Sequence, residues 1–141
     1  MIGKGNGNSN RFKSQELHME LQQWKSHLCL IDDEITFIDR LLNSYVFEPN
    51  TPNLFERLQE YQQRLTATKG KKAKVGGLLA KHQNDLGGIL ECSDNGCNLW
   101  YQKKHETLKT KVKKCLDDFQ GLKSEIFNYA GGILKKRKSD T

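Results

Sequence analysis

The stretch that decides the fold is LHMELQQWKSHLCLIDDEITFIDRLLNSY, residues 17–45. Its apolar residues follow one another at alternating distances of four and three positions: Leu17, Leu21, Trp24, Leu28, Ile31, Ile35, Ile38, Leu42 and Tyr45. A spacing that averages about 3.5 residues puts these side chains on one side of a helix, where a neighbouring helix covers them. The stretch therefore predicts a long helix, over about residues 14–46, that packs lengthwise against others.

Two further core stripes with the same spacing follow in the chain. The second stripe comprises Leu54, Leu58, Tyr61, Leu65, Thr68, Lys72, Val75, Leu79, His82, Leu86 and Ile89. The third comprises Tyr101, His105, Leu108, Val112, Cys115, Phe119, Leu122, Ile126, Tyr129 and Ile133. They predict helices over about residues 52–92 and 97–134, with a bend or frayed patch near residues 68–77, where glycines interrupt the second stripe.

The connections between the predicted helices are short. Pro49 stops the first helix, and Thr51 with Pro52 forms a typical helix start. The turn sequence Ser93-Asp94-Asn95-Gly96 separates the second and third helices. Short connections make consecutive helices antiparallel neighbours. The sequence therefore predicts an all-α, antiparallel up-down-up three-helix bundle or coiled-coil rod over residues 11–135, between a flexible N-terminal tail (1–10) and a basic C-terminal tail (136–141).

Composition narrows the functional classes. The chain has 141 residues, a net charge of +6, 35% hydrophobic residues and four cysteines without a CxxC pair. These features exclude a disulfide scaffold and a zinc ribbon, and no apolar run reaches the about 18 residues that cross a bilayer. No secretory signal is visible, which favours a cytoplasmic protein with free thiols. Cys92 and Cys97 flank the second turn and could bridge under oxidation, although we expect two free thiols there in a reducing compartment.

Three histidines form a candidate site. Turns centred near residue 50 and residues 94–95 would place His82 opposite His18 and close to His105. Three imidazoles in one layer could bind zinc, copper or iron. The alternative, which we favour, is a polar layer that fixes the register of the helices. We predict no cofactor, and no paired catalytic groups are visible, so we expect a protein that is not an enzyme.

Basic residues form a second candidate site. Residues 101–141 contain eleven basic and five acidic side chains, whereas residues 1–50 contain five and seven. The residues that could contact an anionic partner are Lys71, Lys72, Lys74, Lys111, Lys113, Lys114, Lys135, Lys136, Arg137 and Lys138. The alternative interpretation is a solvated helix surface.

Apolar residues outside the core stripes suggest an interface. They are Leu30, Phe37, Leu41, Phe55, Leu78, Leu90, Trp100, Leu116 and Phe127. A rod of three helices has little room to bury them all, and exposed apolar area marks a contact surface. We therefore expect a non-enzymatic helical interaction or scaffold module that binds a protein partner or a second copy through an apolar helix face. The alternative is a basic helical protein that binds nucleic acid or anionic surfaces through its C-terminal third.

Overall fold

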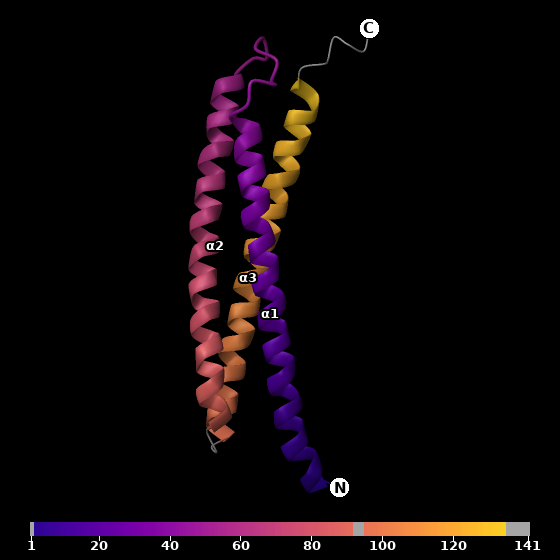
Figure 1. Cartoon of the computed structure of the whole chain (residues 1–141), viewed down its shortest axis with the longest axis vertical. Coiled ribbons are helices and arrows are strands. Elements are labelled where there is room, and N and C mark those ends of the chain that lie inside the picture. The colour runs from indigo at the N-terminus through magenta and orange to yellow at the C-terminus, as the bar shows by residue number, and fades with distance from the viewer. Residues whose placement is uncertain (1, 92–94, 135–141) are drawn as a thin grey trace.

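Three long helices lie side by side and form an elongated rod (Figure 1). The computed structural model describes residues 2–91 and 95–134, with side chains over residues 14–89, 91 and 96–134. The helices are α1 (Ile2–Leu42), α2 (Leu54–Glu91) and α3 (Asn95–Ile133). The chain runs up along α1, down along α2 and up again along α3. The predicted all-α, up-down-up three-helix bundle is confirmed.

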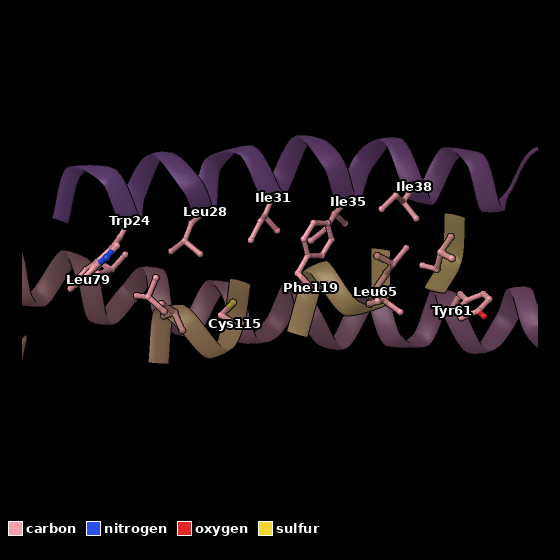
Figure 2. Packing of buried hydrophobic residues seen from close by; sticks show 14 of the residues in the cluster. Trp24, Leu28, Ile31, Ile35, Ile38, Tyr61, Leu65, Leu79, Cys115 and Phe119 are labelled. Atoms are coloured by element: carbon pink, nitrogen blue, oxygen red, sulfur yellow. The ribbon is translucent and has the colours of Figure 1, made fainter. Parts of the chain in front are cut away.

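The predicted core stripes face one another in the centre of the rod. On α1 the buried residues are Leu21, Trp24, Leu28, Ile31, Ile35, Ile38 and Leu42. Figure 2 shows several of these side chains pointing toward α2 and α3, where they meet Tyr61, Leu65, Leu79, Cys115 and Phe119. One continuous cluster of buried apolar side chains therefore holds all three helices together.

Two helices are more regular than the sequence suggests. We expected a tail over residues 1–10, but α1 already begins at Ile2, and its N-terminal end extends past the other two helices (Figure 1). The expected frayed patch near residues 68–77 is absent, because α2 is continuous through them. Each interior glycine costs about 1 kcal/mol relative to alanine. Buried Val75 and Leu79 within α2, and an ion pair from Lys72 to Asp32 on α1, hold this segment in place.

The connection between α1 and α2 covers the end of the bundle. Tyr45 does not extend the first core stripe as expected, since its side chain is 87% exposed. Phe47 is buried instead, and the next backbone N–H, that of Glu48, donates to the carbonyl of Ile133 on α3 at 2.9 Å. Asn53 adopts the left-handed conformation, with φ at 58°, directly before α2. The connection thus runs over residues 43–53, longer than the predicted loop, and α2 begins at Leu54 rather than near residue 52.

The long connection changes the register of the first hairpin. A turn centred on residue 50 would place Lys72 opposite residue 28, but Lys72 contacts Asp32. Gln62 likewise donates to Asn43 at 2.7 Å, about one turn away from its predicted partner. In the second hairpin Arg64 pairs with Glu125 at 2.9 Å, which agrees with the predicted turn near residues 94–95. One hairpin therefore has the predicted register and the other does not.

Candidate functional site

A groove runs along the boundary between α2 and α3. It consists of two adjoining pockets, of about 310 and about 270 Å³, that share Leu78 and Lys111. The described residues that line these pockets all belong to α2 and α3, so the groove lies on the side of this hairpin away from α1. We call it the lysine groove, and it is lined by Lys71, Lys74, Val75, Leu78, Lys81, His82, Asp85, Lys103, Lys104, Thr107, Leu108, Lys111, Lys114, Cys115 and Asp118.

The lysine groove has an apolar floor between two cationic rims. Val75, Leu108 and Cys115 are buried core residues whose outer edges reach the groove, and Leu78 is 41% exposed within it. Seven lysines and two aspartates, Asp85 and Asp118, provide the charges of the lining. Lysine stems can cover apolar surface while their ammonium groups stay in water. The groove therefore offers apolar contact area and positive charge at the same place.

This arrangement follows a second stripe in the sequence that we did not detect. On α2 the stripe has the same alternating spacing as the core and lies one position before it: Lys71, Lys74, Leu78, Lys81 and Asp85. On α3 a matching stripe comprises Lys104, Thr107, Lys111, Lys114 and Asp118. Because both stripes repeat at the core period, each stays at the same edge of its helix along the whole groove.

The structure divides the predicted basic residues into separate groups. Four of them line the lysine groove: Lys71, Lys74, Lys111 and Lys114. Lys72 faces α1 and pairs with Asp32, and exposed Lys113 lines neither pocket. The remaining candidates, Lys135, Lys136, Arg137 and Lys138, lie outside the described residues. Two segments about forty residues apart in the sequence thus supply one cationic surface.

A buried pair of histidines lies next to the groove. His82 and His105 are 4% and 1% exposed, and His82 Nε2 lies 3.0 Å from His105 Nδ1. The other ring nitrogen of His105, Nε2, lies 3.2 Å from a carboxylate oxygen of Glu20 on α1. An ionised carboxylate only accepts hydrogen bonds, so His105 donates through Nε2 and its Nδ1 accepts from His82. The result is a chain of hydrogen bonds from α2 through α3 to α1.

Aromatic rings enclose this pair. The Trp24 ring stacks on His105 with centroids 4.7 Å apart, and the Tyr101 ring stacks on His82 at 4.0 Å. The Tyr101 hydroxyl donates to the carbonyl of His82 at 2.9 Å. Burial and, to a smaller extent, the neighbouring His105 together lower the pKa of His82 to about 4. Burial also lowers the pKa of His105, although Glu20 opposes this effect. Both imidazoles are therefore neutral near pH 7.

The expected layer of three histidines does not form. His18 is exposed, and Glu20 takes the place beside His105. The reason is the shifted register of the first hairpin, which moves His18 away from His82. Among the residues with described side chains, no group of three or more His, Cys, Asp and Glu is arranged to hold a metal ion. The pair and its carboxylate form a polar layer in the core, as in the alternative interpretation of the sequence.

Among the described cysteines Cys97 is disulfide-bonded, so the expectation of free thiols is wrong at this residue. Cys29 is free and exposed, whereas Cys115 is free and buried, and burial raises the pKa of its thiol. The suggested bridge from Cys92 to Cys97 involves Cys92, which lies outside the described residues.

None of the described helices is sufficiently long and apolar to cross a bilayer. No protein-family model, curated protein or solved structure matches the chain.

Proposed function

We propose that this chain is a non-enzymatic interaction module whose lysine groove binds an acidic amphipathic helix of a partner protein. The observation that carries this proposal is the apolar floor around Leu78 between two rims of lysines. An amphipathic helix that lies in a groove places its apolar face on such a floor. Acidic residues along both sides of that helix would meet the lysines. A cytoplasmic location remains an expectation from the sequence.

The contacts of α1 support a helix as the occupant. This helix packs on the other side of the same α2–α3 hairpin and contributes acidic residues to both of its edges. Asp32 pairs with Lys72 on α2, and Glu34 pairs with Lys123 on α3. Glu20 also lies 3.6 Å from Lys109 on α3. An acidic amphipathic helix thus already binds one side of this hairpin, and the lysine groove offers similar chemistry on the other side.

The length of the groove suits a short helix. Along α2 the lining runs from Lys71 to Asp85. Fourteen steps of about 1.5 Å give a groove of about 21 Å, or about four helical turns. A helix of this length presents about six to eight apolar residues on one face.

The composition of the groove favours a protein over a nucleic acid. Asp85 and Asp118 lie among the lysines and would repel phosphates. The floor at Leu78 would also gain little from contact with a sugar–phosphate backbone. A partner with both apolar and acidic residues uses the apolar floor as well as the lysines.

Binding of designed peptides tests the proposal. We would measure fluorescence anisotropy with a helical peptide of about four turns that has leucines on one face and glutamates beside them. A second peptide has lysines in place of the glutamates, a third has serines in place of the leucines, and a labelled DNA duplex serves as the nucleic-acid probe. We expect saturable binding of the first peptide alone.

Two variants on the same helix provide a matched comparison. Lys111 lines both pockets, whereas Lys113 lines neither, and both are exposed. Lys111→Glu should weaken binding of the acidic peptide at least about tenfold, and Lys113→Glu should leave it nearly unchanged. Equal effects of the two variants, or binding of the DNA duplex in preference to the peptide, would refute the proposal.

A further inference from the structure

The outer face of α1 is a second apolar surface, and it has acidic residues beside it. Met19, Leu30 and Phe37 are 63%, 56% and 60% exposed. Their positions differ by eleven and seven residues, so they lie along one side of the helix, away from the core stripe. Such a stripe of large apolar side chains on a helix surface indicates a contact surface.

Exposed acidic residues accompany this apolar stripe. Asp33 lies between Leu30 and Phe37, and Glu16 lies about one turn before Met19. The described ion pairs of α1 use Glu20, Asp32 and Glu34, which contact α2 or α3. The exposed side of α1 therefore has the apolar and acidic character that the lysine groove would bind.

We infer that the outer face of α1 in one copy of this chain occupies the lysine groove of a second copy. The inference rests on the proposed function, because it identifies the source of the acidic helix. Leu30 and Phe37 are seven residues apart, about 10 Å along the helix, and fit within a groove of about 21 Å. Asp33 between them then lies beside the lysines.

The charges at the ends of the contact also agree. Arg40 lies about one turn beyond Phe37 on α1. The groove has an aspartate in each of its two pockets, Asp85 in one and Asp118 in the other. With Leu30 and Phe37 centred in the groove, Arg40 lies near an aspartate whichever way the bound helix points.

The two surfaces determine the kind of assembly. The outer face of α1 and the lysine groove lie on opposite sides of the rod, because α1 packs on the other side of the α2–α3 hairpin. Each copy thus provides one surface and receives the other, which is a head-to-tail contact. Such contacts extend with concentration unless the arrangement closes into a ring.

Sedimentation velocity of the full chain tests this inference. The groove variant is Lys74→Glu/Lys111→Glu, and the helix variant is Leu30→Ser/Phe37→Ser. All four residues are exposed, so circular dichroism should show unchanged helix content. We expect the mass of the wild type to rise with concentration and each variant alone to associate at least about tenfold more weakly.

The decisive experiment mixes the groove variant with the helix variant. The groove variant keeps an intact α1, and the helix variant keeps an intact groove, so an equimolar mixture should form one-to-one dimers. As matched controls, Lys113→Glu and Phe55→Ser change an exposed lysine and an aromatic residue that is 87% exposed, both outside the proposed contact. Both controls should associate like the wild type.

The outcomes separate this inference from the proposed function. A wild type that stays monomeric at high concentration but binds the acidic peptide overturns the inference and leaves the proposed function in place. A wild type that neither associates nor binds the peptide overturns both. A mixture that forms no dimers, or a groove variant that associates like the wild type, overturns the head-to-tail contact.

Discussion

Acidification should destabilise this fold through the buried histidines. Burial and the neighbouring His105 lower the pKa of His82 from 6.5 to about 4 in the folded chain. In the unfolded chain the imidazole is exposed and regains a pKa of about 6.5. Between these two values the unfolded state binds more protons than the folded state, so the free energy of unfolding falls as the pH decreases. The contribution of His82 is fully present above about pH 6.5.

The size of the effect follows from the two pKa values. Linkage gives a loss of about 2 kcal/mol between pH 7 and pH 5, and about 3 kcal/mol at pH 4. His82 is only 4% exposed, so little solvent screening reduces this figure. Burial of His105 acts in the same direction, partly offset by Glu20. At pH 5 most carboxylates are still ionised, which makes the interval from pH 7 to pH 5 the cleanest one.

Urea unfolding followed by far-ultraviolet circular dichroism measures the effect. The variants are His82→Gln and, as a matched control, His18→Gln, which changes an exposed histidine. We expect the wild type and the control to lose at least about 2 kcal/mol between pH 7 and pH 5, and His82→Gln to lose clearly less. A wild type that loses under about 0.5 kcal/mol, or a His82→Gln variant with the full loss, would contradict the neutral buried pair.

Three further predictions concern the stability of the fold. Gly77→Ala should raise the free energy of unfolding by about 1 kcal/mol in urea titrations, since nothing lies within 4 Å of the added methyl group; a decrease would show that α2 needs the glycine. Phe47→Ala should lower the free energy of unfolding by about 3 kcal/mol or more, because Phe47 is 4% exposed. The control Phe55→Ala should change it little, and similar losses in the two variants would argue against a buried Phe47. Lys111→Glu should leave stability unchanged or raise it by up to about 1 kcal/mol, because it introduces an acid among lysines; a clear loss would show that the lysine itself supports the fold.

The sequence determines the fold because its decisive signal is local. Alternating spacings of four and three residues fix which face of each helix is apolar, and the structure buries those faces, from Leu21 on α1 to Ile126 on α3. The register between α1 and α2 depends instead on contacts far apart in the chain. Burial of Phe47 and the bond from Glu48 to Ile133 lengthen the connection. No pattern around residue 50 reveals these contacts, which is why His18 was placed in the wrong layer.

The lysine groove shows a second limit of the same kind. The stripes that line the groove continue one heptad further, from Lys71 to Arg64 on α2 and from Asp118 to Glu125 on α3. There the guanidinium of Arg64 donates two hydrogen bonds to the carboxylate of Glu125, at 2.9 and 3.0 Å, and this pair closes the boundary between the helices. Further along, Lys74 of α2 faces Lys114 of α3, and the boundary stays open as a groove. Like charges across a helix boundary favour an acidic group from outside. The charge pattern of one helix cannot show this, because a lysine stripe is a solvated flank or a binding surface depending on the charges of its neighbour.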